Sequence, residues 1–377
     1  MYDLIVVGAG PAGSTAARTA SIMGLNVLIL EKEVFPRYKP CGGALSDRTI
    51  SLMDFSMPEE LCERTINGAR VHFQGKVAEK RKGYRLTALV TRSNFDQLLL
   101  KKAVEAGSKS KTERVLSVQE REDYVEVQTR NHHYSSRFLV LASGCQDGLK
   151  SVINSREDRD HYGICIVTEV EATEHEINRR LNNLMDIHFG VAAGGYGWIF
   201  PHRGYYSVGI GGLASRMEHP RQIMLDFLKI NGFNGSFRLH GHTIPLGGLK
   251  RHIARKRIML AGDAAGFVDA FTGEGICYAV RSGQIAAKTA TEKLSDPYLD
   301  LAKTYESRCS RDFGDELRYS LLLSRIMHSC PGIFFRMLTG HEEILDRYVE
   351  TATARTTYKN FMRWLFPRLP LCALRSL

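Results

Sequence analysis

The chain has 377 residues, of which 44% are hydrophobic and 24% charged, values typical of a globular protein with one large or two medium cores. Its formal net charge of +10 indicates an anionic partner: nucleic acid, an acidic membrane surface, a phosphorylated ligand or an acidic protein. The eight cysteines form no CxxC pair, which excludes the usual zinc and iron–sulfur spacings, and no apolar run has the length of a membrane-spanning helix.

The chain opens on a predicted strand, YDLIVV, which begins at the second residue. This start leaves no room for a signal peptide, and the cysteine pattern does not resemble a secreted disulfide framework. We therefore expect a cytoplasmic protein, either soluble or peripheral on the inner face of the cell membrane.

A glycine pattern follows this strand. Gly8, Gly10 and Gly13 form GxGxxG at the start of a predicted helix, and a second apolar strand ends in Glu31, eighteen residues after Gly13. Gly8 allows a tight turn, Gly10 lets a pyrophosphate approach the backbone, and Gly13 lets the helix and strand pack closely. The helix start offers free N–H groups to phosphate, and Glu31 is suited to accept hydrogen bonds from ribose hydroxyls. Together these features predict a dinucleotide site.

The next distinctive stretch is the loop PRYKPCGGALS, residues 36–46, which places Cys41 between a proline and two glycines. Three interpretations remain open: the loop backbone shapes a cofactor site, the thiol is catalytic or handles protons, or the cysteine is inert. Arg37 and Lys39 add positive potential that favours a thiolate. A metal site is disfavoured because no second ligand lies at a usable spacing.

Short apolar runs separated by turn residues occupy the middle of the chain, and they predict an antiparallel sheet. These runs cover residues 161–171, 185–189, 196–201 and 205–213. Within them Tyr196, Trp198 and Phe200 alternate, so all three lie on one face of a strand. Such a stripe is most often core. Small residues precede this stripe and leave space beside it, so the alternative is one wall of an apolar tunnel.

A second cofactor signal lies in RIMLAGDAAGFVDAFTGEGICYAVRSG. A strand over residues 257–261 is followed by Asp263, and a turn containing Gly273 and Gly275 opens a long helix. A carboxylate at this strand end suits a polyol such as the ribityl chain of FAD, which NAD lacks, and the helix start suits the flavin ring. The alternative is that Asp263 only caps the next helix.

These motifs resemble the geranylgeranyl reductase family, flavoproteins of the p-hydroxybenzoate hydroxylase fold, and are similar to archaeal digeranylgeranylglycerophospholipid reductases. The similarity rests on GxGxxG with its acid, on PRYKPCGGALS, on GDAAGFVDAFTGEGI, and on YGWIFP, which matches a YxWxFP pattern. The stretch LVTRSNFDQLLLKKAVEAG also matches an Arg-x-x-Phe-Asp helix entry. The resemblance covers about residues 1 to 290.

The resemblance implies an α/β fold, with a Rossmann-type FAD-binding domain, an inserted antiparallel-sheet substrate domain and a C-terminal helical segment. It assigns residues 1–72, 90–158 and 243–290 to the FAD domain, 73–89 and 159–242 to the sheet domain, and 291–377 to the helical region. It implies FAD contacts at Gly8, Gly10, Ala12, Gly13, Glu31, Cys41, Gly42, Ala44, Arg92, Val115, Asp263, Gly275 and Ile276. It implies substrate contacts at Tyr196, Trp198, Phe200 and Pro201, Cys41 as the candidate catalytic residue, and no metal.

The function implied is the FAD-dependent reduction of isolated C=C bonds in a geranylgeranyl chain, on a lipid or a prenyl pyrophosphate. The proton comes from Cys41 or from a water held by its loop. Because no second GxGxxG is present, the electrons come from NAD(P)H that docks transiently or from a ferredoxin. The basic net charge suits an acidic ferredoxin or a phosphorylated substrate equally.

Two other functions must be weighed against the reductase. A flavin monooxygenase or halogenase shares the fold, although the single Trp198 and the Cys-Gly-Gly loop favour the reductase. An electron-transfer flavoprotein that reduces quinone would need a cluster domain, and Cys309, Cys330 and Cys372 are too far apart to build one. Nucleic-acid binding is disfavoured because the basic residues are scattered and form no reader motif.

The chain becomes helical after about residue 290. We predict that its last segment, residues 360–377, contacts a membrane, since apolar and basic residues are mixed there and two prolines prevent one long helix. The alternative is that this segment packs on the protein's own core. The apolar residues concerned are Trp364, Leu365, Phe366, Leu369, Leu371 and Leu374, and the basic ones are Arg363, Arg368 and Arg375.

Overall fold

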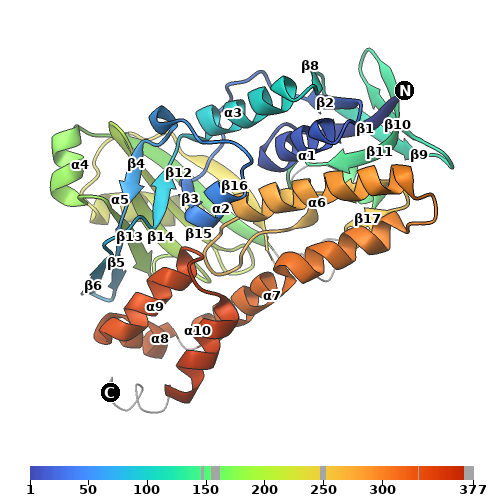
Figure 1. Cartoon of the computed structure of the whole chain (residues 1–377). Helices are drawn as coiled ribbons and strands as arrows, with labels where there is room; N and C mark the ends of the chain where they lie inside the picture. Colours follow the sequence, from blue (N-terminus) through green and yellow to red (C-terminus); the bar gives the residue numbers. More distant parts are fainter. Residues whose placement is uncertain (146–147, 154–161, 247–251, 330, 369–377) are drawn as a thin grey trace.

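A computed structural model describes residues 1–145, 148–153, 162–246, 252–329 and 331–368 (Figure 1). The apolar runs at residues 2–7 and 27–31 belong to a parallel ladder, as is typical of strands that are largely buried on both faces. Its strands are β18 (Ile258–Leu260), β11 (His133–Leu141), β1 (Tyr2–Val7), β2 (Val27–Glu31) and β8 (Lys109–Thr112), in that spatial order. An antiparallel extension adds β9 (Val115–Glu120), β10 (Val125–Thr129) and β17 (Ala254–Arg255). The predicted Rossmann-type fold class is confirmed.

Two helices far apart in the sequence lie side by side beside this sheet (Figure 1). They are α1 (Pro11–Ile22) and α6 (Ile276–Ser295), and α1 also packs on α3 (Arg92–Glu105). A Cβ at Gly283 of α6 would lie 2.3 Å from the carbonyl oxygen of Ala12, so only glycine allows this close approach. The packing brings the start of α6 to the glycine-rich start of the chain.

The middle of the chain forms a seven-stranded sheet. Its spatial order is β16 (His240–Pro245), β12 (Tyr162–Glu171), β15 (Tyr205–Leu213), β14 (Tyr196–Pro201), β13 (Leu184–Phe189), β5 (Gly68–Phe73) and β6 (Lys76–Arg81). The predicted runs pair with one another in antiparallel fashion, and the sheet becomes mixed only where β13 pairs in parallel with β5. The reason is that β5 enters the sheet from a segment more than a hundred residues upstream.

Strands β5 and β16 cross the domain boundaries expected at 72/73 and at 242/243. We propose that both whole strands belong to the sheet domain. A small third sheet links the two large ones, and short helices complete the connections. These elements are β3 (Ala44–Ser46), β7 (Thr87–Leu89), β4 (Arg64–Ile66) and α2 (Asp47–Ser51).

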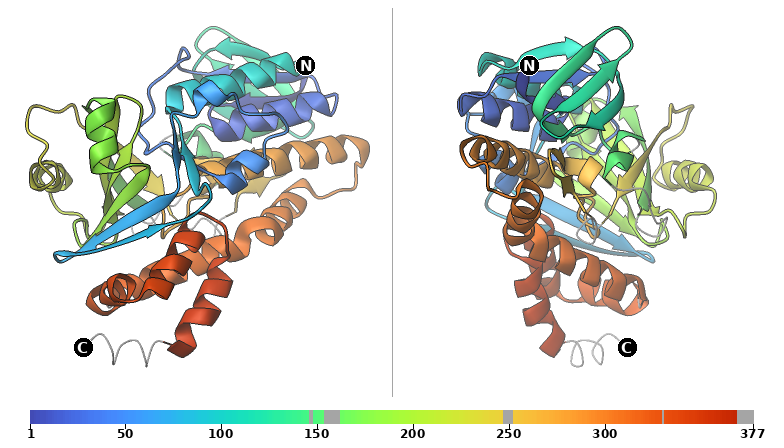
Figure 2. Two further views of the ribbon diagram at one scale, coloured as in Figure 1. Left: turned by 60° about the vertical axis from the view of Figure 1, so that its left-hand side comes forward. Right: turned by 90° about the vertical axis from the view of Figure 1, so that its right-hand side faces the viewer.

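Helices cover both faces of the seven-stranded sheet. On one face lie α4 (Glu174–Arg180) and α5 (Pro220–Ile230), which pack against apolar residues such as Ile199 and Val208. The C-terminal helices pack on the other face, and Figure 2 shows them gathered at the end of the molecule away from α1. They are α8 (Pro331–Gly340), α9 (Glu342–Ala352) and α10 (Tyr358–Leu365), joined to the first sheet by α7 (Leu301–Ser329).

Helix α10 packs on the protein core, because Phe361, Met362 and Leu365 are 1–3% exposed. The expectation that Leu365 contacts a membrane is therefore wrong. Phe366 is 39% exposed, whereas Leu369, Leu371, Leu374 and Arg375 lie outside the described residues. In the part of the chain that the structure describes, no helix is long and apolar enough to cross a membrane.

Candidate active site

One large cavity, about 800 Å³ in volume, lies where the two large sheets and the C-terminal helices meet. It brings together residues from the glycine-rich start, the cysteine loop, the aromatic strand and the start of α6. The predicted residues that line it are Gly8, Gly10, Ala12, Glu31, Cys41, Gly42, Ala44, Arg92, Val115, Tyr196, Trp198, Phe200, Asp263, Gly275 and Ile276. Gly13 and Pro201 do not line it. Gly13 instead packs against the Gly8 turn, while Pro201 is buried at the end of β14.

The turn between β1 and α1 requires glycine for steric reasons. Gly8 has a φ of +95°, and a Cβ there would lie 2.5 Å from the carbonyl oxygen of Ala142. A Cβ at Gly13 would lie 1.8 Å from the carbonyl oxygen of Gly8. Gly10 caps α1 without a side-chain hydrogen bond, so the first N–H groups of the helix are open to a ligand in the cavity.

Arg37 shows that this end of the cavity fits an anion. Its Nη2 lies 3.1 Å from Asp96 Oδ2 and 3.6 Å from the ideal Cβ position of Gly10, beside the start of α1. Its Nη1 is buried and has no hydrogen-bond partner among the described residues. A buried guanidinium donor is costly to leave unpaired, and a phosphate oxygen is a suitable acceptor. The residues present therefore fit the pyrophosphate of a dinucleotide.

Glu31 ends β2 at the same side of the cavity. Its side chain is buried, and its two oxygens accept hydrogen bonds from the backbone N–H groups of Ala9, at 2.7 Å, and Glu33, at 3.0 Å. A carboxylate oxygen has two lone pairs, so each keeps one for a ribose hydroxyl. The backbone bonds fix the position of the acid beside the glycine turn.

The cysteine loop follows, and its shape is set by the residues around it. Gly43 has a φ of +71° and donates its N–H to Cys41 Sγ at 3.4 Å. A Cβ at Gly42 would lie 2.8 Å from the Phe200 ring, so the aromatic strand packs directly on the loop. Arg92 faces Cys41 and forms two 2.9 Å hydrogen bonds with the buried carboxylate of Asp96.

A buried histidine, His202, contacts the backbone of this loop. The ring of His202 contacts Glu63 Oε2 through Nδ1 at 2.6 Å and the carbonyl oxygen of Gly42 through Nε2 at 3.1 Å. Both partners are hydrogen-bond acceptors, so the ring joins the Glu63 carboxylate to the backbone of the loop. Burial raises the pKa of Glu63, but hydrogen bonds from His202 and from the Thr91 hydroxyl outweigh it and lower that pKa below its usual range.

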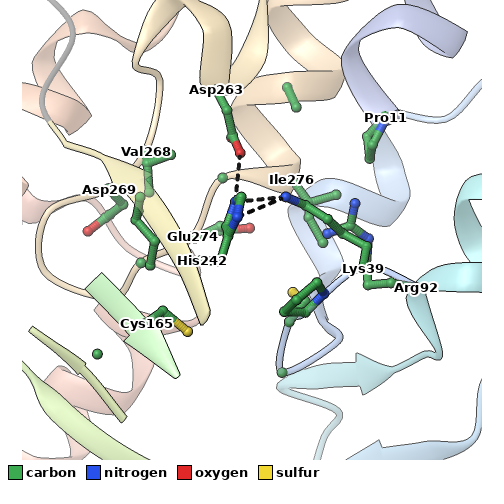
Figure 3. Close-up of a pocket in the computed structure, with 18 of the residues that line it drawn as sticks. Pro11, Lys39, Arg92, Cys165, His242, Asp263, Val268, Asp269, Glu274 and Ile276 are labelled. Atoms are coloured by element: carbon green, nitrogen blue, oxygen red, sulfur yellow. Dashed lines mark hydrogen bonds and ion pairs between the residues drawn. The ribbon is translucent and has the colours of Figure 1, made fainter. Parts of the chain in front are cut away.

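Beside this loop three polar side chains contact one another, with His242 between Lys39 and Asp263 (Figure 3). Lys39 Nζ contacts His242 Nε2 at 2.7 Å, and His242 Nε2 lies 3.9 Å from Asp263 Oδ2. Burial lowers the pKa of Lys39. Burial raises the pKa of Asp263, but His242, Lys39 and Arg92 outweigh it, so the pKa lies below its usual range.

Two other carboxyl groups near the start of α6 differ from Asp263 in the direction of their pKa shift. Burial raises the pKa of both Asp269 and Glu274, and both line the cavity. Glu274 accepts hydrogen bonds from the hydroxyls of Ser46, at 3.0 Å, and Thr49, at 3.1 Å, while Asp269 accepts from two backbone N–H groups. These bonds tie the turn before α6 to the segment after the cysteine loop.

The far end of the cavity is apolar. Tyr196, Trp198 and Phe200 line it from β14, and the Trp198 N–H lies 3.4 Å from Ser207 Oγ. The Tyr196 hydroxyl donates to the carbonyl oxygen of Thr272. Phe271 and three residues of α9 complete the wall. The α9 residues are Tyr348, Val349 and Ala352. This end can therefore hold a long apolar chain with few polar contacts.

Sequence reasoning did not identify His202, His242 or the α9 residues as part of the site. His202 continues the alternation of Tyr196, Trp198 and Phe200 by one more step, so the period-two pattern contained a signal for it. His242 and Tyr348 lie in no recognisable motif. They reach the cavity only because β16 and α9 fold against it.

Comparison with known protein families gives one match: the model described as FAD dependent oxidoreductase matches residues 3–145. A digeranylgeranylglycerophospholipid reductase of Methanococcoides burtonii is 30% identical over 351 residues, 87% of this chain and 84% of that protein. A menaquinone reductase of Mycobacterium tuberculosis is 29% identical over 350 residues, 85% and 84% of the two chains.

Solved structures agree in fold. A geranylgeranyl bacteriochlorophyll reductase-like protein of Thermoplasma acidophilum has a TM-score of 0.76 at 20% identity, covering 100% of this chain and 99% of its own. A flavin-dependent brominase has a TM-score of 0.72 at 19% identity, covering 97% and 98%. At these identities the structural likeness is evidence for the fold only.

Proposed function

Because this chain belongs to the geranylgeranyl reductase family of FAD-dependent oxidoreductases, we propose that it saturates isolated C=C bonds of an isoprenoid chain carried by a lipid or a prenyl pyrophosphate. The observation that carries the proposal is the cavity itself. One continuous space connects the glycine-rich start of α1 to an aromatic wall with few polar groups. Such a space suits a flavin at one end and an apolar chain at the other.

FAD would be held by the residues at the polar end. The N–H groups at the start of α1 and the unpartnered Nη1 of Arg37 would bind the pyrophosphate, and Glu31 would bind the ribose. Asp263 would accept from the ribityl hydroxyls, and the N–H groups at the start of α6, beginning at Ile276, would meet the flavin ring.

FAD, when bound and reduced, supplies a hydride to one alkene carbon, and a proton adds to the other. The chain's own residues provide the rest. The aromatic wall holds the alkene in place and excludes water, since each buried CH₂ contributes about 0.8 kcal/mol to binding. The cysteine loop, fixed between Phe200 and His202, would set the distance between the alkene and the cofactor.

The substrate class follows from the names of the relatives and from the cavity. The relatives are named for a geranylgeranyl phospholipid and for menaquinone, both of which carry isoprenoid chains with unactivated alkenes. The external reductant is NAD(P)H or a ferredoxin, and the net charge of +10 favours an anionic partner of either kind. The brominase is similar in fold alone and gives no separate support for halogenation.

Mass spectrometry tests this function. The purified FAD-loaded protein, reduced without oxygen, is mixed with a geranylgeranyl phospholipid, a geranylgeranyl pyrophosphate and a menaquinone in separate reactions. We expect the mass of at least one to rise by one hydrogen pair for each alkene reduced, with stoichiometric flavin oxidation. Oxidation of the reduced flavin by oxygen with hydroxylated or halogenated product, and no saturated product, would contradict the proposal.

Cys41 is tested by Cys41→Ser. We expect this variant to keep FAD and to lose alkene reduction by about tenfold or more, because the thiol lies on the cavity wall between Arg92 and Gly43. Cys62→Ser is the control, since this cysteine lies outside the cavity lining. An unchanged rate in Cys41→Ser would leave the backbone of the loop, rather than its thiol, as the important feature.

We also propose that the end of the chain contacts an anionic membrane surface, from which a lipid substrate enters. Phe366 is exposed, and Arg363 and Arg368 lie beside it. Replacing Arg363, Phe366 and Arg368 together by serine removes these exposed groups and keeps the buried face of α10, whereas a cut at residue 360 would remove buried core residues. Flotation with anionic vesicles should weaken while the flavin spectrum stays the same; unchanged flotation would refute the contact.

A further inference from the structure

The reaction proposed above consumes one proton for each alkene reduced, and the cavity must be resupplied with protons after every turnover. Arg92, the cation beside Cys41, does not serve this purpose, because a guanidinium keeps its proton at physiological pH. A proton source needs a group that carries an exchangeable proton and a route from that group to water. The contact between Lys39 and His242 places these two residues to supply both.

Lys39 lies two residues before Cys41 on the same loop, and both line the cavity. Its Nζ contacts the His242 ring at 2.7 Å, a distance at which a proton passes directly between two nitrogens. Figure 3 shows both side chains in the pocket, with His242 joined to Lys39 on one side and to Asp263 on the other. Lysine and histidine are thus joined in one hydrogen-bonded row that ends at the cofactor end of the cavity.

The position of His242 supplies the route to water. It lies on β16, the edge strand of the seven-stranded sheet, and its side chain is 17% exposed. Its neighbour on the adjacent strand is the buried Cys165, whose thiol pKa is raised to about 12 by burial and which therefore keeps its proton. A proton taken up by His242 at the edge therefore has Lys39 as its acceptor within hydrogen-bond distance.

The charges around Lys39 make its protonation sensitive to electrons in the cavity. Burial and Arg92 disfavour the ammonium form, whereas Asp263 and the Cys41 and Cys145 thiols favour it. Asp263 is the charged group that faces His242 from the other side, and Glu274 lies on the same wall. Two electrons added to a cofactor beside this row bring negative charge, which raises the affinity of the amine for a proton.

We propose that Lys39 and His242 form a proton relay, in which Lys39 takes up a proton when the bound flavin is reduced and releases it to the alkene carbon that does not receive the hydride. The balance is one hydride from the reduced cofactor, one proton from Lys39 Nζ and one saturated C–C bond. His242 then returns a proton to Lys39 from water. The second half of this relay rests on the proposed alkene reduction, but the first half requires only the flavin.

The test measures protons rather than product. FAD-loaded protein is photoreduced without oxygen in weakly buffered solution, and a pH indicator reports proton uptake for each two electrons. Lys39→Met removes the site, and Lys39→Arg keeps the cation but does not exchange its proton. We expect both variants to take up fewer protons than the parent, by up to about one per flavin. Lys101→Met, a change at an exposed position on α3, should match the parent.

Two further measurements keep the relay testable. His242→Gln retains Lys39 but interrupts its resupply, so proton uptake should slow by about tenfold. Single-turnover alkene reduction should lose its dependence on pH in Lys39→Arg. Equal uptake by the parent, Lys39→Met and Lys39→Arg would overturn the relay even if alkenes are reduced. A difference in uptake in a protein that reduces no alkene would support the proton-uptake step and refute the proposed function instead.

Discussion

The two ends of the cavity are built in different ways. At the cofactor end, shape comes from backbone: Gly8 and Gly13 accept no Cβ, and the starts of α1 and α6 present N–H groups. At the apolar end, shape comes from side chains such as Trp198 and Tyr348, which arrive from β14 and α9. The first end is therefore specified locally by a few small residues, while the second depends on packing between distant segments.

Because of this difference, the two ends of the cavity should tolerate substitutions to different extents. A backbone-defined site fails when a single Cβ is added, because the backbone has no alternative path. A side-chain-defined wall can repack, so changes there should alter which chain is accepted and how fast it reacts, before they affect folding. The following substitutions test this contrast, from the largest expected effect on the cavity to the smallest.

Gly13→Ala should have the largest effect. The new Cβ would lie 1.8 Å from the carbonyl oxygen of Gly8, so either α1 or the turn must move. We expect a loss of about 3 kcal/mol or more in stability together with loss of bound FAD. Gly83→Ala is the matched control, since nothing lies within 4 Å of its Cβ. Flavin content and urea unfolding measure the effect, and a Gly13→Ala protein with full FAD would refute the steric argument.

Trp198→Phe tests the apolar end. The smaller ring removes contact area from the wall but leaves the α1 turn untouched, so FAD content should be unchanged. We expect kcat/KM for the isoprenoid substrate to fall about tenfold, equivalent to ~1.4 kcal/mol. Ser207→Ala removes only the partner of the indole N–H and should have a smaller effect. If Trp198→Phe lost FAD instead, the two ends would not be separable.

His202→Phe tests the boundary between the two ends, where the aromatic strand meets the cysteine loop. The substitution keeps an aromatic ring beside Tyr205 but leaves Glu63 and the Gly42 carbonyl oxygen without their partner. We expect a loss of about 2 kcal/mol, since the remaining groups stay buried. The loop should loosen, so alkylation of Cys41 by iodoacetamide should become faster.

The sign of the pH dependence of the His202→Phe effect follows from the pKa of Glu63. A carboxyl whose pKa is lowered in the folded protein contributes stability above its unfolded pKa, and this contribution is lost as pH falls through the folded value. The difference in stability between the parent and His202→Phe should therefore shrink in acid. Tyr205→Phe should give a smaller effect of the same sign, because the Tyr205 hydroxyl lies 3.4 Å from Glu63 Oε2 and also lowers that pKa. A difference that grows in acid would contradict this account of the network.

The same contrast explains what the sequence could predict. The glycine turn, Glu31, Asp263 and the start of α6 were predicted because each motif is contiguous and has one steric or electrostatic purpose. The apolar end was predicted only through Tyr196, Trp198 and Phe200, which share a strand. Tyr348 and His242 were not predicted, since nothing in their local sequence indicates which distant surface they meet. The buried face of α10 was also misjudged, because amphipathic residues suit a core and a membrane alike.

The smallest effect on FAD content and alkene reduction should come from a residue outside both ends. His188 lies on β13, on the face away from the cavity, where it stacks on His72 with ring centroids 4.1 Å apart. Within the described residues His72, Asp186 and His188 bring possible metal ligands within 4.8 Å of one another. The two rings are parallel to within 3°, so their nitrogens lie in separate planes and do not converge on one ion. Asp186 also lies 3.6 Å from Arg70, so its charge is already compensated without a metal.

Acid should act on the protein through His188. Burial, with a smaller contribution from His72, lowers its pKa to about 4, whereas an unfolded histidine titrates near ~6.5. Between these values the unfolded chain binds more protons, so stability falls as pH drops from about 6.5 to 4, by on the order of 2 kcal/mol. His328, whose pKa is also lowered to about 4 by burial, adds to the slope.

His188→Phe should therefore flatten part of this pH dependence in urea unfolding, while FAD content and alkene reduction stay at parental values. His133→Gln, at an exposed position, should leave the slope unchanged. An unchanged slope in His188→Phe would mean that the outer face of the sheet is not where acid destabilises the protein, and that the cavity itself is the more acid-sensitive region.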